Sequence, residues 1–279
     1  MISRLINGRT LAERIEEEAA REVKERGLEP GLGVILVGED PASQLYVRKK
    51  REACERVGVM FDLMEIATDA PEEIVLRAVH ELNGRDDIHG ILVQLPLPEG
   101  QDTDRVMRSI DPAKDADGFH PARLKLISDG EPCDPPGLIE GIMLLVAETD
   151  FEPKGRHAVI AANSPVFALP LESELRAAGL EVETVNGDFP GLPEAFRRGD
   201  LVVTALGRPQ LVTGDMLKPG AVVIDVGTTK VEGRTVGDVE FETAREVAAW
   251  LTPVPGGVGP ITVAMLIRNV VRLAAGDRT

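Results

Sequence analysis

Apolar runs bounded by glycine or proline alternate with helical patterns in the first half of the chain. Residues 31–38 read Gly-Leu-Gly-Val-Ile-Leu-Val-Gly, which is typical of a strand buried on both faces. Further strands are predicted at residues 60–66 and 90–96, and helices at residues 10–26, 41–57 and 71–83. This strand–helix–strand–helix–strand order predicts parallel βαβ units with right-handed crossovers.

A second series of strands follows the rigid stretch Pro132–Gly137, where the pattern changes. Ser164 and Pro165 come directly after one of these strands and can serve as the cap and first residue of a helix. A helix that starts at the end of a strand is the layout of a Rossmann half, and its N-terminus can bind phosphate. The predicted strands are residues 157–162, 180–185, 200–205 and 221–226, between helices at 138–149 and 261–274.

The first loop of this second series lacks the glycine fingerprint of dinucleotide-binding proteins. Ala162 and Ala168 stand where glycines would be spaced. Residues with a Cβ disfavour the tight turn and the close backbone approach that a pyrophosphate needs. The pattern alone therefore makes nucleotide binding plausible but weakly supported.

Composition narrows the class of protein. The chain has 279 residues, 43% of them hydrophobic but only 3% aromatic, which favours an aliphatic α/β core. Its net charge is 31 − 47 = −16, so a nucleic acid backbone would be repelled. Two cysteines, Cys54 and Cys133, form neither a zinc motif nor a disulfide framework, which suits a cytoplasmic protein. We expect no signal peptide and no membrane span, because no run of about 18 apolar residues occurs.

The helix at residues 41–57 carries the first candidate chemistry. Ser43, Tyr46 and Lys50 are spaced i, i+3 and i+7, so they project from one face. An aromatic ring one turn from an ammonium group suits a flat heteroaromatic ligand that exchanges a proton. The alternative is a solvated basic surface, since residues 48–51 are all basic.

Two further segments hold polar residues next to predicted strands. Gln94 interrupts the strand at 90–96 near its C-terminal end, where ligands of open α/β sheets collect, although a buried structural glutamine is equally compatible. Asp115 and Asp117 lie in a Pro- and Gly-containing loop. Two carboxylates are too few for a good metal site, so no metal is expected. A single carboxylate that accepts paired N–H donors of a heterocycle fits better, and a plain Asx-rich turn is the alternative.

The stretch Thr252–Thr262 is the part of the chain richest in residues with special backbone properties, with three glycines and three prolines among eleven residues. Such a loop has fixed bends and bare backbone, which favours a place where a ligand ring lies against peptide groups. A rigid structural turn is the alternative.

Taken together, these segments resemble the bifunctional methylenetetrahydrofolate dehydrogenase/cyclohydrolase family over nearly the whole chain. The motifs are Ser43-x-x-Tyr46-Val47-x-x-Lys50, Gly90-Ile-Leu-Val-Gln94-Leu-Pro-Leu-Pro98, Lys114-Asp-x-Asp117-Gly118-Phe119, Val223-Ile-Asp225-Val-Gly227 and Thr252-Pro-Val-Pro-Gly-Gly-Val-Gly-Pro260-x-Thr262. The resemblance implies two α/β domains with a cleft between them, the second a Rossmann-like parallel sheet. Residues 1–137 plus 261–279 would form the folate-binding catalytic domain, and residues 138–260 the nucleotide-binding domain.

The resemblance also implies an activity and a set of site residues. The expected reactions are oxidation of 5,10-methylene-tetrahydrofolate by NADP and hydrolysis of the 5,10-methenyl product to 10-formyl-tetrahydrofolate. Lys50 would be the general acid/base, Gln94 would tune its protonation, and Asp117 would bind the pterin. Substrate binding would involve Ser43, Tyr46, Pro255, Gly256, Gly257 and Val258, and cofactor binding Asn163, Ser164, Pro165, Ala205, Gly207, Gly227 and Thr228. The family usually forms homodimers through the cofactor domain.

The departures from the family pattern lie mostly in the cofactor half. Asn163 stands where the family commonly has an arginine suited to a 2′-phosphate, and Val185–Asp188 replaces a His/Ser/Thr-rich loop. Asp134 adds a carboxylate to the Cys133–Gly137 segment. Loss of an arginine–phosphate contact costs about 1.5–3 kcal/mol. Three hypotheses stay open: a bifunctional enzyme that uses NADP or NAD, a cyclohydrolase with a structural Rossmann half, and a non-catalytic folate-binding paralogue.

Overall fold

The computed structural model describes residues 3–277, which divide into two compact units. One unit comprises the N-terminal residues through Ala12 together with Leu138–Thr262. The other comprises Glu13–Gly137 together with the residues from Val263 onward. Helices α1 (Gly8–Arg26) and α10 (Val258–Ala275) each begin in the first of these units and continue in the second. Because Lys50 lies in one unit and Asn163 in the other, we call them the lysine unit and the nucleotide unit.

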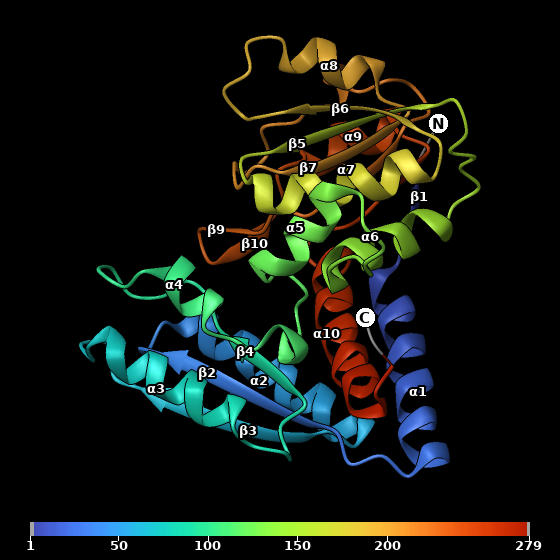
Figure 1. The fold of residues 1–279 in the computed structure, drawn as a ribbon. Coiled ribbons are helices and arrows are strands. Elements are labelled where there is room, and N and C mark those ends of the chain that lie inside the picture. Colours follow the sequence, from blue (N-terminus) through green and yellow to red (C-terminus); the bar gives the residue numbers. More distant parts are fainter. Residues whose placement is uncertain (1–2, 278–279) are drawn as a thin grey trace. The chain divides into compact units, whose positions relative to one another are not determined.

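The lysine unit is built on a three-stranded parallel sheet in the order β3-β2-β4 (Figure 1). All seven residues of the central strand β2 are buried, as the apolar run predicts. Alternate side chains serve opposite faces, because Leu32, Val34 and Leu36 pack in one hydrophobic cluster and Ile35 and Val37 in another. The first cluster also includes residues of α2 and α10, and the second cluster includes residues of α3. The elements of this unit are β2 (Gly31–Val37), α2 (Pro41–Val57), β3 (Met60–Ile66), α3 (Glu72–Asn83) and β4 (Gly90–Val93).

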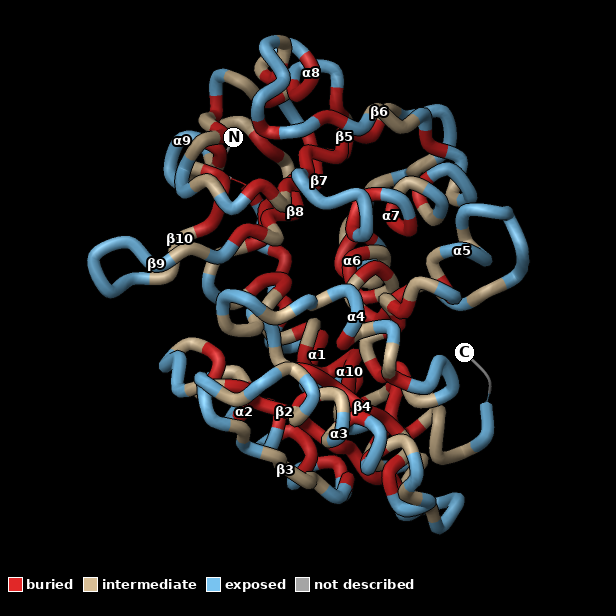
Figure 2. Tube along the Cα trace, turned by 60° about the vertical axis from the view of Figure 1, so that its left-hand side comes forward, coloured by how far each residue is buried: buried red, intermediate tan, exposed pale blue. Residues whose placement is uncertain are grey.

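The nucleotide unit holds a six-stranded parallel sheet in the order β1-β11-β8-β7-β5-β6. Its central strands β5, β7 and β8 are coloured as buried in Figure 2. The chain passes from β5 to β6 on one side and then to β7 on the other, so the strand order reverses between β5 and β7. Ligands of open α/β sheets bind at such a switch point, at the carboxyl ends of the strands. The elements are α6 (Gly137–Ala147), β5 (His157–Ala162), α7 (Pro165–Ala177), β6 (Glu181–Val185), α8 (Leu192–Arg198), β7 (Leu201–Ala205), β8 (Val222–Asp225), β9 (Thr229–Val231), β10 (Arg234–Val236), α9 (Phe241–Val247) and β11 (Trp250–Leu251).

The N-terminal residues differ from the expected domain division. Strand β1 (Arg4–Leu5) pairs in parallel with β11, so it belongs to the nucleotide sheet rather than to residues 13–137. A two-residue strand leaves no apolar pattern, and its partner lies almost at the other end of the chain. The remaining short elements are α4 (Thr103–Arg108), a 3₁₀ turn at Pro112–Lys114, α5 (Pro121–Asp129) and a 3₁₀ turn at Gly214–Met216.

Helix α10 is long and apolar enough to cross a membrane by length and composition alone. However, 56% of that 18-residue window is buried inside the structure. Its residues Leu266, Ile267 and Val270 pack into the cluster that also contains Leu32 and Val34 of β2. The apolar composition of α10 is therefore accounted for by its place in the core.

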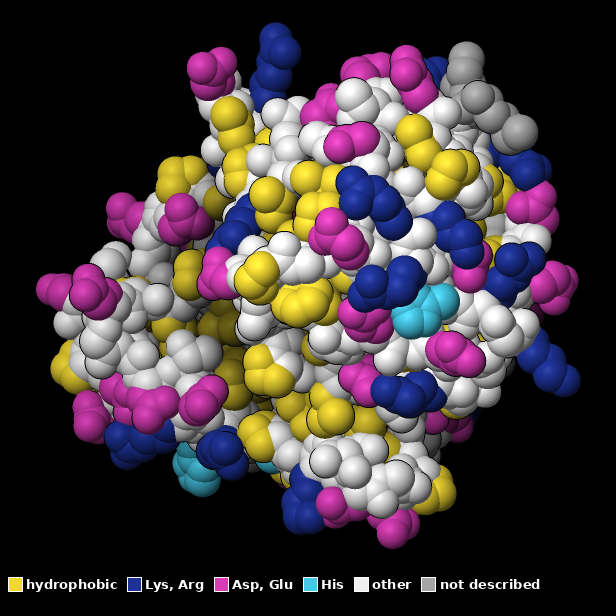
Figure 3. All heavy atoms as spheres, turned by 90° about the horizontal axis from the view of Figure 1, so that it is seen from above, with side chains coloured by type: hydrophobic (Ala, Val, Ile, Leu, Met, Phe, Trp, Pro, Cys, Tyr) yellow, Lys and Arg dark blue, Asp and Glu magenta, His cyan; other side chains and the backbone are white. Residues whose placement is uncertain are grey.

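Charged side chains of both signs cover the surface. Figure 3 shows acidic and basic groups intermixed on the face that it presents. Many of the exposed charges form local ion pairs, for example Arg176 with Glu172 at 2.7 Å and Arg198 with Glu183 at 2.7 Å. Such pairs are neutral, so the net charge of −16 comes from the acidic side chains in excess of the basic ones. Exposed pairs of this kind contribute little to stability.

Candidate active site

Helix α2 carries the lysine site, and its start is set by local chemistry. Asp40 caps the helix, because its Oδ2 accepts a hydrogen bond of 2.7 Å from the backbone N–H of Ser43. Pro41 takes the first helical position, as predicted. Ser43, Val47 and Lys50 are buried on one face of the helix. Two of the three residues of the predicted face, Ser43 and Lys50, are thus buried together, whereas Tyr46 is half-buried and Arg48 and Lys49 are exposed.

Lys50 and Gln94 are joined by a hydrogen bond. Lys50 Nζ donates to Gln94 Oε1 at 2.8 Å, and the lysine is only 9% exposed. Gln94 Nε2 donates to the carbonyl oxygen of Leu95 at 2.7 Å, which orients the amide with its oxygen toward the lysine. The strand ends at Val93, one residue before Gln94, rather than continuing to residue 96 as predicted. Gln94 therefore lies at the carboxyl end of β4 and not within it.

Burial and a neighbouring carboxylate act in opposite directions on Lys50. Removal of its ammonium group from water lowers the pKa of Lys50, and the negative charge of Asp117 partly opposes this. Burial in turn raises the pKa of Asp117, and the charge of Lys50 lowers it. A lowered pKa makes the neutral amine, the form that can accept a proton, available at a lower pH than in a solvated lysine.

The loop that holds Asp117 separates the roles of its two carboxylates. Asp115 Oδ2 accepts a hydrogen bond of 2.7 Å from the backbone N–H of His120, so this carboxylate stabilises the loop itself. Asn269 of α10 donates from Nδ2 to the carbonyl oxygen of Ala116 at 3.1 Å. Gly118 has φ of +82°, and a Cβ there would lie 2.8 Å from Cα of Pro136. Asp117 is therefore the carboxylate of this loop that is left to act on a ligand.

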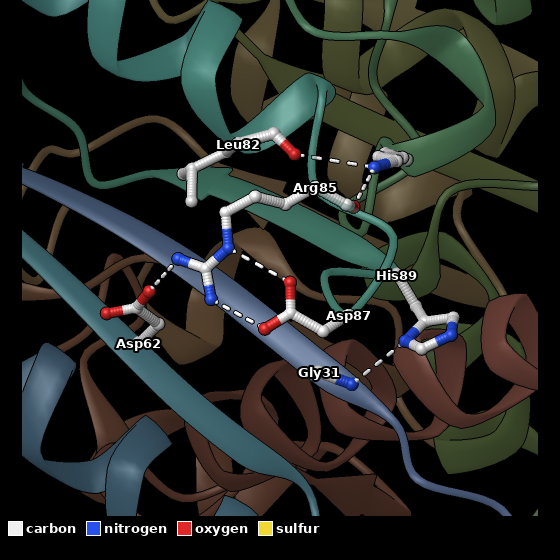
Figure 4. A network of polar contacts seen from close by, with 7 residues as sticks. Gly31, Asp62, Leu82, Arg85, Asp87 and His89 are labelled. Carbon is white, nitrogen blue, oxygen red and sulfur yellow. Dashed lines mark hydrogen bonds and ion pairs between the residues drawn. The ribbon is translucent and has the colours of Figure 1, made fainter.

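Lys114, from the same sequence motif, has a structural role that the sequence reasoning missed. Its Nζ donates to the carbonyl oxygens of Leu82, Asn83 and Arg85 at 3.3, 2.9 and 2.6 Å. These carbonyls lie at the C-terminal end of α3, where a helix lacks internal partners. Figure 4 shows the surrounding network, in which Arg85 also contacts Asp62 and Asp87.

Tyr46 lies one turn before Lys50 on α2 and is partly buried. The ammonium nitrogen of Lys49 lies 5.5 Å from the centroid of the Tyr46 ring. This distance is within the range of a cation–π contact. The predicted stacking of Tyr46 on a ligand remains a prediction.

In the nucleotide unit, Asn163 connects the ends of neighbouring strands. It directly follows β5, and its Nδ2 donates to the carbonyl oxygen of Leu206, after β7, at 2.9 Å. Its Oδ1 accepts from the backbone N–H of Gly187, after β6, at 3.0 Å. Ala162 and Ala205 are register partners at the ends of β5 and β7. Asn163 therefore spans the switch point with a neutral side chain.

The predicted helix after β5 is confirmed as α7, with Ser164 as its cap and Pro165 in its first turn. The Ser164 side chain makes no capping hydrogen bond. Ala162 and Ala168 are 6% and 7% exposed, so their methyl groups pack within the fold. A helix N-terminus at the switch point of a parallel sheet fits a dinucleotide pyrophosphate, even without the glycine fingerprint.

Two buried carboxylates shape the loops that contain Gly207 and Gly227. Asp238 Oδ2 accepts from the backbone N–H groups of Leu206 and Gly207 at 2.6 and 3.3 Å. Asp225 Oδ1 accepts from the N–H groups of Gly227 and Asp238 at 3.0 and 3.1 Å. A Cβ on Gly227 would lie 2.3 Å from Cγ of Asp238, so only glycine fits there. The next residue, Thr228, is exposed. Asp238 lies in no motif that the sequence reasoning used, whereas Asp225 lies in a quoted one.

The loop rich in glycine and proline is shorter than predicted, because α10 already begins at Val258. The bond between Val254 and Pro255 is cis, and Gly256 has φ of +116°. The N–H of Gly257 donates to the carbonyl oxygen of Pro253 at 2.7 Å, which closes the turn. The role of Pro255–Val258 in substrate binding remains a prediction.

Among residues 3–277, no group of three or more His, Cys, Asp or Glu side chains is arranged to hold a metal ion. Independently of that, the described residues place a buried lysine at the end of one parallel sheet and a helix N-terminus at the switch point of another. Together these features define a two-unit α/β oxidoreductase with an additional proton-transfer site.

Known proteins specify this class further. Residues 6–117 match the catalytic domain of tetrahydrofolate dehydrogenase/cyclohydrolase, and residues 132–278 match its NAD(P)-binding domain. The bifunctional protein FolD of Moorella thermoacetica is 42% identical over 98% of this chain and 99% of the relative. The bifunctional protein FolD of Bordetella avium is 44% identical over 100% of this chain and 99% of the relative.

Solved structures agree with the sequence relatives. The bifunctional FolD dehydrogenase/cyclohydrolase of Campylobacter jejuni has a TM-score of 0.93 at 37% identity and covers 98% of this chain and 99% of its own. The Trypanosoma brucei enzyme, solved with NADP and an inhibitor, has a TM-score of 0.93 at 36% identity and covers 99% of this chain and 98% of its own. The chain belongs to the tetrahydrofolate dehydrogenase/cyclohydrolase family, the bifunctional enzymes of tetrahydrofolate-dependent one-carbon metabolism.

Proposed function

We propose that this chain oxidises 5,10-methylene-tetrahydrofolate to 5,10-methenyl-tetrahydrofolate and hydrolyses that product to 10-formyl-tetrahydrofolate. The observation that carries the proposal is the buried Lys50, whose Nζ lies 2.8 Å from Gln94 Oε1 and whose pKa is lowered by burial beside Asp117. A bound NAD(P) supplies the acceptor for the hydride that leaves the methylene carbon. The residues of this chain supply positioning and proton transfer.

In the hydrolysis, Lys50 acts as general base and then as general acid. Its neutral amine accepts a proton from water as the water oxygen bonds to the one-carbon unit of the methenyl substrate. Its ammonium form then protonates N5 as the bond between N5 and that carbon breaks. The hydroxyl proton on the carbon leaves to solvent at the same time, which gives the formyl group on N10 and a net release of one proton. Gln94 Oε1 accepts from Lys50 in both protonation states and holds Nζ in place.

Asp117 and Tyr46 position the folate in this proposal. The carboxylate of Asp117 accepts hydrogen bonds from the N–H groups of the pterin, which also compensates its burial. The ring of Tyr46 stacks on the planar part of the substrate. Buried Ser43 lines the same face of α2, and its N–H is already committed to Asp40.

The cofactor residues form the second part of the proposal. The first turn of α7 with Ser164 and Pro165 would hold the pyrophosphate, and Ala205, Gly207, Gly227 and Thr228 would lie along the dinucleotide. We place the protein in the cytoplasm, where free Cys54 and Cys133 stay reduced, and expect a homodimer. Sedimentation velocity of the purified protein tests the dimer directly.

Two assays with matched variants test the proposal. Lys50→Met should reduce methenyl-tetrahydrofolate hydrolysis to the uncatalysed background, while Arg48→Met, on the exposed face of the same helix, should leave it unchanged. Methylene-tetrahydrofolate oxidation is measured in parallel with NAD and with NADP. If hydrolysis survives in Lys50→Met, the role of Lys50 is wrong. If oxidation occurs with neither dinucleotide, the chain is a cyclohydrolase only.

A further inference from the structure

The loop after β6 is the feature of the nucleotide unit that departs most from a phosphate-binding loop. Strand β6 ends at Val185, beside β5 at the edge of the sheet, and Asp188 follows three residues later. In Rossmann-type sheets an acidic residue after this second strand accepts a hydrogen bond from the adenosine ribose, whereas an arginine nearby accommodates a 2′-phosphate. The charge present at this position therefore bears on which dinucleotide is selected.

Hydrogen bonds to three side chains hold this loop in one conformation. Asn186 Oδ1 accepts from the backbone N–H of Asp188 at 3.0 Å, and Asn163 Oδ1 accepts from that of Gly187 at 3.0 Å. Arg208 Nη1 donates to the carbonyl oxygen of Gly187 at 2.7 Å. A Cβ on Gly187 would lie 3.2 Å from Cζ of Arg208, so the guanidinium packs directly against this glycine. The position of Asp188 is thus fixed before any ligand binds.

The positive charge nearest to Asp188 is already committed to it. Arg208 Nη2 forms an ion pair with Asp188 Oδ1, in addition to its bond with Gly187. The backbone of Arg208 is itself anchored, since its N–H donates to buried Asp238 Oδ1 at 2.8 Å. Across the switch point, both ends of the Asn163 amide are occupied by Leu206 and Gly187. A 2′-phosphate would therefore meet a carboxylate, a neutral amide and an arginine that is already paired.

A ribose hydroxyl meets a more favourable arrangement. The side chain of Asp188 is 83% exposed, so its carboxylate is accessible from solvent although Arg208 contacts one oxygen. A carboxylate can accept a hydrogen bond from a hydroxyl, and such charge-assisted bonds are short and strong. It repels a phosphate, which carries nearly two negative charges at neutral pH.

We propose that Asp188, held in place by Arg208 and Asn163, binds the adenosine 2′-hydroxyl and makes this enzyme select NAD over NADP. This inference rests on the proposed dehydrogenase function and assigns the residue that determines its cofactor. Because a hydrogen bond to a charged group corresponds to about 10- to 150-fold in affinity, we expect kcat/KM with NAD to exceed that with NADP by at least about 10-fold.

Three variants and two readouts test this assignment. Asp188→Ser removes the carboxylate, releases Arg208, and should lower kcat/KM for NAD while it raises that for NADP, so that the ratio falls at least about 10-fold. Asp188→Asn keeps an acceptor without the charge and should change the ratio less. Glu181→Ser removes the same charge from the opposite end of β6 and should leave the ratio unchanged. Calorimetric titration of each protein with ADP-ribose and 2′-phospho-ADP-ribose measures the same discrimination without catalysis.

The possible outcomes separate this inference from the proposed function. A wild-type preference for NADP, or a ratio that is the same in wild type and Asp188→Ser, would overturn the assignment while the dehydrogenase function stands. Oxidation with neither dinucleotide, together with absent ADP-ribose binding, would overturn both. The cyclohydrolase rate of each preparation uses no dinucleotide and reports separately on the lysine unit.

Discussion

The hydrogen bond between Lys50 and Gln94 permits a direct test of how the lysine is tuned. Gln94→Glu replaces the amide by a carboxylate, one of whose oxygens would take the place of Oε1, 2.8 Å from Lys50 Nζ. The negative charge of a carboxylate is shared by its two oxygens, so its centre lies farther from Nζ than the nearer oxygen does. Opposite unit charges about 4 Å apart attract by about 4 kcal/mol at an effective dielectric constant of about 20. Burial of the new carboxylate offsets part of this attraction. We therefore expect the pKa of Lys50 to rise by about 1–3 units, equivalent to about 1.4–4 kcal/mol.

The consequence is a shift of the pH profile in a known direction. If neutral Lys50 accepts the proton of water, kcat/KM for hydrolysis rises with pH through the pKa of Lys50 in the free enzyme. In Gln94→Glu the midpoint of this rise should move upward by the same 1–3 units. Gln94→Met removes an acceptor that favours the ammonium form, so its midpoint should move downward. The two variants therefore shift the profile in opposite directions.

The assay follows loss of methenyl-tetrahydrofolate absorbance between pH 6 and pH 9.5, with the uncatalysed rate subtracted at each pH. Glutamate cannot donate to the carbonyl oxygen of Leu95 as Gln94 Nε2 does, so some displacement of the side chain is expected. Displacement of the side chain at position 94 lowers the plateau of kcat/KM against pH, whereas its added negative charge moves the midpoint. The two effects are therefore measured separately from one profile. Identical midpoints in wild type and both variants would show that Lys50 is not the titrating group or that Gln94 does not control it.

Three further predictions concern other parts of the chain. Tyr46→Ala should raise KM for the folate substrate about 2- to 12-fold through loss of stacking, whereas Tyr46→Phe should not, as steady-state kinetics will show. Lys114→Met should lower the free energy of unfolding by about 2–3 kcal/mol in urea titrations, because the Lys114 ammonium group donates hydrogen bonds to three carbonyl oxygens. The control Lys125→Met breaks only an exposed ion pair and should change the free energy of unfolding by less than about 0.5 kcal/mol. Burial raises the pKa of Asp225 to about 6, so protonated Asp225 stabilises the folded state fully below about pH 4, and this contribution is lost as the pH rises through 6. Asp225→Asn cannot lose it, so the change in free energy of unfolding between low and high pH should differ between wild type and variant by about 2–3 kcal/mol.

The parts of the fold that sequence reasoning predicted share a local cause. Strand β2 is buried on both faces, so it reads as an uninterrupted apolar run. The start of α2 depends on Asp40, Pro41 and Ser43, which are neighbours in the chain. The helical spacing of Ser43 and Lys50 likewise needs only α2 to place both on one face. Each of these features leaves its mark within a short stretch of sequence, even where distant residues, such as those of α10 against β2, complete the burial.

The features that were missed depend on residues far apart in the chain. Strand β1 has only two residues and pairs with β11 near the other terminus, so no local pattern marks it. Asp238 is buried beside the backbone of residues 206–208, about thirty positions earlier. Lys114 binds the end of α3 through long-range hydrogen bonds, although its motif pointed to the folate site. Their roles follow from topology, which the sequence pattern does not contain.

The two halves of the enzyme differ in how their polar residues depend on one another. In the lysine unit, Lys50, Gln94 and Asp117 act on each other through one hydrogen bond and one charge interaction, and all three match the family motifs. In the nucleotide unit, Asn163 and Arg208 both bond the backbone of Gly187, and Arg208 pairs with Asp188.

If Asp188 selects NAD as proposed, a complete 2′-phosphate site at these positions would require more than one substitution. An arginine at position 163 would remove the amide that accepts from Gly187 and donates to Leu206, and Asp188 would still neutralise Arg208. Conversely, loss of Asp188 alone would free Arg208 without a second cation at position 163. The neutral side chain at 163 and the acidic side chain at 188 thus act on the same loop, one through the N–H of Gly187 and the other through Arg208, so a substitution at either position changes the setting of the other.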